Sequence, residues 1–170
     1  MADKCVSGTC CITDLMRLSI CLLFAISLHA QPTPEAEVRQ LMGKFLTAFD
    51  NLDWPAFRQC WADDPVVFFP SLVEPTGKRT ENAATFEGDW HRQFDLIREG
   101  AASRGVTKAP FQRIEPKDLR IDFPAPSVAV VTFHLGPGRN GLGRRMFVVT
   151  RTDAGWKITH LHASNLSLTP

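Results

Sequence analysis

The sequence contains no tyrosine among its 170 residues, so no phenol is available as a hydrogen-bond donor or acid in a functional site. An excess of charge of one sign is also lacking. The 19 Lys+Arg stand against 18 Asp+Glu, which argues against nucleic acid or an acidic membrane surface as a partner. The apolar run Leu18–Leu28 falls short of the ~20 residues that a membrane-spanning helix needs. What remains is a near-neutral chain, long enough for one globular domain with a proper core.

The N-terminal segment predicts export. The run Leu18–Leu28 follows an arginine and ends two residues before Ala30, which is typical of a secretory signal peptide at residues 1–30. The stretch before the run carries a net negative charge, so a true translation start at Met16 is an alternative. We therefore expect an exported protein, periplasmic or extracellular, with a single domain at residues 31–170 and no stable membrane anchor after cleavage.

Cysteine is scarce outside that segment. Four of the five cysteines lie within residues 1–30, which leaves Cys60 as the only thiol of the expected mature chain. An intramolecular disulfide is therefore excluded after cleavage. Because Cys60 stands beside Trp61 in an apolar, helical setting, we expect a buried structural thiol.

The first part of the expected domain has helical periodicity. A threonine, a proline and a glutamate at residues 33–35 combine an N-cap hydroxyl, a proline at the first helical position and an acid in the first turn. Apolar residues then recur at three- and four-residue spacing: Val38, Leu41, Met42, Phe45, Leu46, Phe49 and Leu52. This pattern predicts an amphipathic helix with a broad apolar stripe.

Two more helices are expected before the chain turns to strands. A short one begins after Asp53 and is stopped by the Asp-Asp-Pro sequence at residues 63–65. A longer one is expected near Asn82–Gly100, with the apolar stripe Phe86, Trp90, Phe94 and Ile97. The stripe fits either core packing or the wall of a pocket.

The second half of the sequence has the alternation and β-branched residues of strands. A buried strand is expected at Val66–Phe69, before the third helix. Later strands are expected at Leu119–Phe123, Val128–Leu135, Arg144–Thr152 and Trp156–Leu166, the last two joined by a tight turn at Asp153–Gly155. This order predicts an α+β fold in which a curved antiparallel sheet packs with one face on three helices.

The last strand carries the polar residues that most clearly indicate a site. His160, His162 and Ser164 recur with period two from Trp156 and Ile158, so we expect all five side chains on one face. Such a face is apolar at one end and titratable at the other, as in a pocket wall. A closed core with well hydrogen-bonded histidines has the same pattern.

The strand partners favour an inward direction for these histidines. With a three-residue turn, Val148 lies opposite His160 and Met146 lies opposite His162. A histidine in such a pocket could act as base or acid near neutral pH, which makes His160 and His162 the catalytic candidates. The expected pocket lining is Phe68, Trp90, His134, Met146, His160 and His162.

Polar residues of this sequence offer two other chemistries, metal binding and anion binding. Histidines at i and i+2 can reach one metal ion, with His134 or His91 as a third ligand, but no HExxH-like or carboxylate motif supports a metal site. We therefore expect neither a metal nor a cofactor. Arg144 and Arg145 must face opposite sides of a strand, and the inward one could hold an anionic ligand group or pair with a carboxylate.

The sequence resembles the SnoaL-like branch of the nuclear transport factor 2-like superfamily. The matching pieces are FLTAFDNLDW, VVFFP, GRRMFVV and, most specifically, the final GWKITHLHASN; the resemblance covers roughly Glu35 to Leu166. Its similarity to relatives of the calcium/calmodulin-dependent kinase association domain implies a cone-shaped barrel that is dimeric through its sheet. The resemblance also implies a pocket between the sheet and the long helices. The tyrosine of steroid-isomerase-like members and the Asp-Arg-Asp set of epoxide hydrolases have no counterpart in this sequence.

These observations lead to one expected function and two alternatives. We expect an exported homodimer that binds a small, partly apolar organic molecule in the cone pocket. One alternative is an enzyme of the isomerase, dehydratase or cyclase type that uses the pocket histidines for acid–base catalysis. The other is a non-catalytic dimerisation or assembly module whose cone is filled by its own side chains.

Overall fold

The computed structural model describes residues 32–69, 82–138 and 141–166. All of them belong to the second of two units into which the chain divides, Pro32–Pro170. The expected signal peptide at residues 1–30 lies outside the described residues. Among the helices of the described part, none is both long and apolar enough to cross a membrane.

The helices begin where local capping chemistry places them. The described residues form α1 (Pro34–Asn51), α2 (Trp54–Gln59) and α3 (Ala83–Ala102). The Thr33 hydroxyl accepts a hydrogen bond from the first turn of α1, and the Asp53 carboxylate does the same for α2. Asn82 and Thr85 exchange hydrogen bonds in a capping box at the start of α3. All three predicted helices are present, although α2 ends earlier than predicted.

The strands form one five-stranded sheet in the order β1-β5-β4-β3-β2. Its members are β1 (Trp61–Phe68), β2 (Lys117–Ala125), β3 (Val128–Gly138), β4 (Gly141–Thr152) and β5 (Gly155–Leu166). Strands β2 to β5 make the predicted antiparallel meander, while β1 pairs with β5 in parallel, so the curved sheet is mixed. A parallel pair needs a long connection, and α3 together with three strands separates β1 from β5 along the chain.

The start of β1 differs from the prediction. We expected a helix to continue up to the Asp-Asp-Pro sequence at residues 63–65, but α2 ends at Gln59 and β1 begins at Trp61. Trp61 pairs with Ile158, and regular pairing resumes only at Val66. A proline is tolerated here because the ladder between β1 and β5 is irregular around Pro65.

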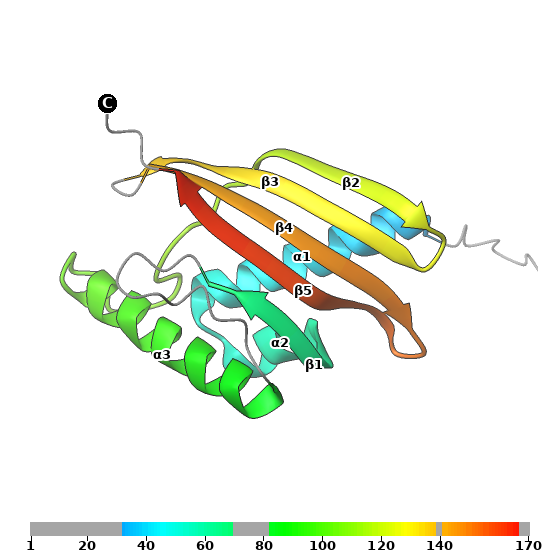
Figure 1. Cartoon of the computed structure of the whole chain (residues 1–170). Helices are drawn as coiled ribbons and strands as arrows, with labels where there is room; N and C mark the ends of the chain where they lie inside the picture. The colour runs from blue at the N-terminus through cyan, green and yellow to red at the C-terminus, as the bar shows by residue number, and fades with distance from the viewer. Residues whose placement is uncertain (1–31, 70–81, 139–140, 167–170) are drawn as a thin grey trace, which may run out of the picture. The chain divides into compact units, whose positions relative to one another are not determined.

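The core lies between the helices and one face of the sheet, which we call the helix side. Figure 1 shows α1 crossing behind the strands of the meander. Rings from α1, α2 and α3 meet rings from β1 and β4 in an aromatic core of Phe45, Phe57, Trp61, Phe86, Trp90, Phe94 and Phe147, all buried. Phe45 of α1 packs edge-on against Phe147 of β4, and Phe86 of α3 packs edge-on against Trp61 of β1. Burying each large apolar side chain contributes roughly 1.5–3 kcal/mol, so this cluster is the main stabilising element.

Strand β5 changes face in its middle because it contains a β-bulge. Val149 pairs with Ile158 and Val148 pairs with His160, which leaves Thr159 as an extra residue on β5. The Thr159 hydroxyl donates a hydrogen bond to the carbonyl of Val148 at 3.1 Å. Because of this one extra residue, each side chain after it points to the face opposite to the one that strict alternation would give.

The bulge overturns the prediction that the histidines share a face with the start of the strand. Trp156 and Ile158 are buried on the helix side, and beyond the bulge that side is taken by Leu161 and Ala163. The side chains of residues 160, 162 and 164 therefore point to the opposite face, which we call the outer face.

The predicted cross-strand partners were nevertheless right, because two differences cancel. We assumed a three-residue turn, whereas Thr152 pairs with Gly155 and only two residues lie between the strands. The bulge at Thr159 adds one residue back. His160 consequently faces Val148, and His162 faces Met146.

Candidate functional site

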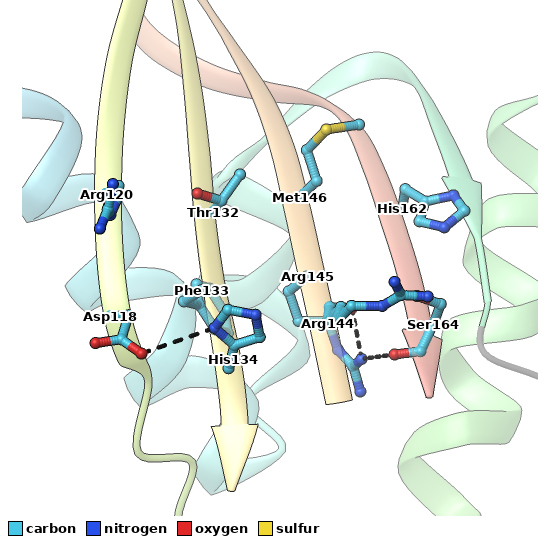
Figure 2. Close-up of a pocket in the computed structure, with 10 residues that line it drawn as sticks. All are labelled: Asp118, Arg120, Thr132, Phe133, His134, Arg144, Arg145, Met146, His162 and Ser164. Carbon is cyan, nitrogen blue, oxygen red and sulfur yellow. Dashed lines mark hydrogen bonds and ion pairs between the residues drawn. The ribbon is translucent and has the colours of Figure 1, made fainter. Parts of the chain in front are cut away.

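The outer face of the sheet contains a hollow of about 500 Å³. Volumes of roughly 300–1,000 Å³ are typical of pockets for small organic molecules. Residues of β2, β3, β4 and β5 line it: Asp118, Arg120, Thr132, Phe133, His134, Arg144, Arg145, Met146, His162 and Ser164 (Figure 2).

Sheet register brings these residues together in two rows across the strands. The first row runs from Arg120 through Thr132 and Met146 to His162, one residue from each of four strands (Figure 2). The second row places Arg144 between His134 on β3 and Ser164 on β5. Neighbouring strands lie ~4.8 Å apart, so side chains in one row can contact the same small ligand.

The hollow contains more positive than negative charge. Its carboxylate, Asp118, lies 3.9 Å from the ring nitrogen Nδ1 of His134. Among the residues that the structure describes, neither Arg120 nor Arg144 forms an ion pair with a carboxylate. The hollow therefore presents two guanidinium groups and one carboxylate, beside two imidazoles that can gain charge on protonation.

An apolar surface accompanies these polar groups. The Met146 side chain is 44% exposed in the middle of the first row. At the β1 end of the row, the ring of Phe68 lies 5.9 Å from the ring of His162, measured between centroids. A ligand in the hollow would find apolar contact at Met146 and donors on both sides of it.

The second arginine of the pair is held on the other side. Although Arg145 borders the hollow, strand alternation directs its side chain to the helix side, where Nη1 donates to the carbonyl of Ser164 and to Asn165 Oδ1. Burial lowers the pKa of the Arg145 guanidinium from its ordinary value. The absence of a side chain at Gly143 makes room for it, because a Cβ there would lie 3.3 Å from Arg145 Nη1. Arg144 and Arg145 thus face opposite sides, as predicted, and the inward one is fixed by neutral oxygens.

The structure brings five of the six predicted pocket residues to one face, the outer face. His134, Met146 and His162 line the hollow, and Phe68 contacts His162 from β1. His160 is exposed one row away, paired with Val148 and, on β1, with Val66. The sixth residue is apart from them.

Trp90 lies in the aromatic core on the helix side. Its ring is 4% exposed and packs edge-on against Phe57, with centroids 4.8 Å apart. Its indole N–H has no acceptor among the described residues. Trp90 and the outer-face residues therefore cannot line one hollow.

Sequence reasoning missed four lining residues, Asp118, Arg120, Thr132 and Phe133, although the alternation of the strands gave a signal for three of them. Asp118 and Arg120 alternate with the apolar residues of β2, where Leu119 and Ile121 pack against the core. That alternation marks both polar residues as members of the outer face. Thr132 carries the same signal, because it and His134 alternate along β3 with the buried residues Val131 and Phe133, whereas Phe133 itself carries none.

The arrangement is suited to binding and to proton exchange. Within the described ranges, no group of three histidine, cysteine, aspartate or glutamate side chains is positioned to hold a metal ion. His91, one proposed third ligand, packs against Trp54 of α2 with ring centroids 4.2 Å apart and the rings tilted by 41°. The imidazole of His134 beside Asp118 could accept or release a proton at the edge of the hollow.

Known proteins that are similar to this chain share its fold. A family model described as a SnoaL-like domain matches residues 38–168. A nuclear transport factor 2-like protein of unknown function from Pseudomonas putida KT2440 is 21% identical, with a TM-score of 0.56 over 76% of this chain and 84% of that one. A candidate dehydratase of the same family from Streptomyces avermitilis is 17% identical, with a TM-score of 0.56 over 79% and 98%.

A third solved structure agrees with these. A candidate calcium/calmodulin-dependent protein kinase type II association domain from Thiobacillus denitrificans is 21% identical, with a TM-score of 0.51 over 80% of this chain and 97% of that one. No curated protein matches the sequence significantly. At such identities the likeness concerns the α+β fold, which is as predicted, and not the chemistry.

Proposed function

Because the chain belongs to the SnoaL-like domain family of the nuclear transport factor 2-like superfamily, we propose that it is a binding protein for a small, partly apolar organic molecule. The observation that carries the proposal is the hollow on the outer face. It combines an exposed apolar side chain, Met146, with polar groups from four strands in a volume of about 500 Å³. This combination of apolar surface and a few convergent polar groups is what binds small molecules.

The expected location of the pocket, between the sheet and the long helices, differs from this one, and the packing of the helix side favours the outer face. The space between helices and sheet is occupied by tightly packed rings, such as Phe57, which touches rings of α1, α3 and β1. Admitting a ligand there would require displacing close-packed side chains, at a cost of several kcal/mol. The hollow needs no such rearrangement.

Two methionines offer a direct test, one on each side of the sheet. Met146 lines the hollow, and Met42 of α1 is 1% exposed in the core. With isotope-labelled methionine methyl groups, a library of small organic molecules is titrated by NMR, and hits should shift the Met146 resonance while leaving Met42 unchanged. Hits that shift Met42 instead would place the ligand on the helix side and contradict the proposal.

We also propose that a second copy of this chain covers the rest of the outer face. A row of partly buried valines, Val66, Val148 and Val130, crosses β1, β4 and β3 around His160. A second copy would present the same row, and a two-fold arrangement would pack the two rows against each other. Light scattering of the pure protein should give a dimer, and Val148→Asp should give a monomer with an unchanged fold.

Export remains part of the proposal, carried by the composition of residues 1–30. N-terminal sequencing of the protein from its native source should find a chain that begins after Ala30. A mature chain that retains Ala2 would contradict export by this signal.

A further inference from the structure

The middle of the hollow is rich in donors and poor in acceptors. Arg144 lies at its centre, beside Ser164 in its own row and His162 in the next. A guanidinium offers only donors, a serine hydroxyl can donate, and an imidazole donates from at least one nitrogen. A ligand that complements this surface must supply acceptors.

The carboxylate of the hollow is badly placed to neutralise this charge. Asp118 belongs to β2, two strands away from β4, which corresponds to ~10 Å between the strand backbones. Its neighbour is His134, at 3.9 Å. In the described part of the chain, Arg144 makes no ion pair, so no carboxylate occupies its N–H groups.

We propose that the ligand of the hollow carries an oxyanion, a carboxylate or a phosphate group, which binds to Arg144. This inference rests on the proposed function and adds the chemical class of the ligand. The planar guanidinium donates two parallel hydrogen bonds to two oxygens of such a group, and Ser164 is placed to donate a third. The oxyanion therefore lies over β4 and β5, near the edge of the sheet where β4 begins and β5 ends.

The apolar part of the ligand is then expected to lie over the row that contains Met146. Met146 and the neighbouring rings of His162 and Phe68 lie in the adjacent row, toward the middle of the sheet. Arg120 and Thr132 close the far side of the hollow. An aromatic ring or a short aliphatic chain with one terminal oxyanion fits this division of polar and apolar surface.

Three probes that share a phenyl ring and differ in charge test whether the hollow prefers an oxyanion: benzoate, phenyl phosphate and neutral benzyl alcohol. Each is titrated at millimolar concentration into the full chain with labelled methionine methyl groups, and affinity is read from the Met146 resonance. We expect at least one anion to bind about tenfold or more tightly than benzyl alcohol. We also expect that affinity to fall as salt is added, because the hollow is open to solvent. The tighter of the two anions identifies the oxyanion.

Variants assign the effect to one side chain. Arg144→Gln should remove the preference for the anion and leave the affinity for benzyl alcohol unchanged, whereas Arg144→Lys, which keeps the charge but loses the planar fork, should retain part of it. Arg92→Gln is the matched control. Arg92 lies on α3, with a side chain that is 76% exposed and paired with Asp89, and the same loss of charge there should change nothing.

The outcomes distinguish this inference from the proposed function. Equal affinity for the three probes, with no effect of Arg144→Gln, would overturn the oxyanion and leave a binding hollow in place. No response of Met146 to any probe would overturn both. If Arg92→Gln lowers the affinity for the anion as much as Arg144→Gln does, the anion is attracted by the net charge of the protein. This result would also overturn the role of Arg144.

Discussion

The two faces of the sheet are built from the same five strands and yet have opposite contents. On the helix side, aromatic and aliphatic side chains fill the space, and the rings of Phe57 and Phe147 are at most 1% exposed. On the outer face, arginines, histidines and a methionine surround an open hollow. The strand alternation that packs the core on one side therefore also gathers the polar residues on the other.

The difference between the faces depends on one residue of β5. Without the bulge at Thr159, strict alternation would turn His160 and His162 toward the helices and Leu161 toward solvent. With it, the apolar residues on both sides of the bulge reach the same core. A single inserted residue thus keeps the apolar residues of both halves of β5 in the core and leaves the two histidines on the outer face.

The largest expected effect comes from deleting one residue of β5 outside the bulge, because the deletion turns the residues before it to the opposite face. Deletion of Lys157 should turn Trp156 out of its buried place and break its 2.9 Å hydrogen bond to Glu37, at a cost of about 3–5 kcal/mol, the magnitude of a buried Trp→Ala change. Urea unfolding monitored by circular dichroism measures the loss.

The control is deletion of Thr159, the bulged residue itself. It removes the extra residue and leaves Ile158 and His160 on the faces that they already occupy, so it should cost only about 1 kcal/mol for the lost hydrogen bond to Val148. If this deletion costs as much as deletion of Lys157, the assignment of the two faces is wrong.

A second pair of variants compares the faces by cavity formation. Phe57→Ala on the helix side should destabilise the protein by about 3–5 kcal/mol, because the side chain is fully buried among other rings. Met146→Ala on the outer face should cost about 0.5 kcal/mol or less. Thermal or urea unfolding provides both numbers, and comparable losses would mean that the outer face is covered in solution.

The smallest expected effect concerns a carboxyl group at the end of α1. Asp50 accepts the backbone N–H of Ile114 at 3.0 Å, and burial raises the pKa of its carboxyl above the ordinary value of 3.8. Below 3.8 the group is protonated in both the folded and unfolded states. As the pH rises through the folded pKa, the folded state takes on the cost of a partly buried charge, so this group's contribution to stability falls.

Asp50→Asn should remove that pH dependence, since the amide keeps an acceptor for Ile114 and carries no charge. Asp50→Ala should lose about 1 kcal/mol at every pH, because the N–H is left without its partner. Urea unfolding between about pH 3 and 7 separates the two variants. A wild-type contribution that increases as the pH rises from 3.8 would show that the hydrogen bond from Ile114 outweighs burial.

Much of the fold could be predicted from local chemistry. The residues at 33–35 begin α1 as expected, α3 starts within one residue of its expected position, and the stripe from Val38 to Leu52 turns toward the core. The meander follows from the alternation in β2 to β5. The early start of β1 could not be predicted, because Pro65 fits into this strand only where the pairing with β5 becomes irregular.

The candidate site was predictable in its residue types but not in its location. The polar residues of β5 were recognised, and the phase change from Ile158 to Leu161 was a visible sign of the bulge. In β4, apolar Met146 and Val148 alternate with apolar Phe147 and Val149, so that strand alone indicates neither face.

By itself the sequence determined the helices, the strands and the family, because capping, periodicity and turn chemistry act over a few residues. Tertiary structure alone decided which side the histidines face and which residues share the hollow. Alternation along a strand defines two faces but does not say which one the helices will cover. Packing of the aromatic core selects that face. Sheet register then brings Arg120 and His162, far apart along the chain, into one row.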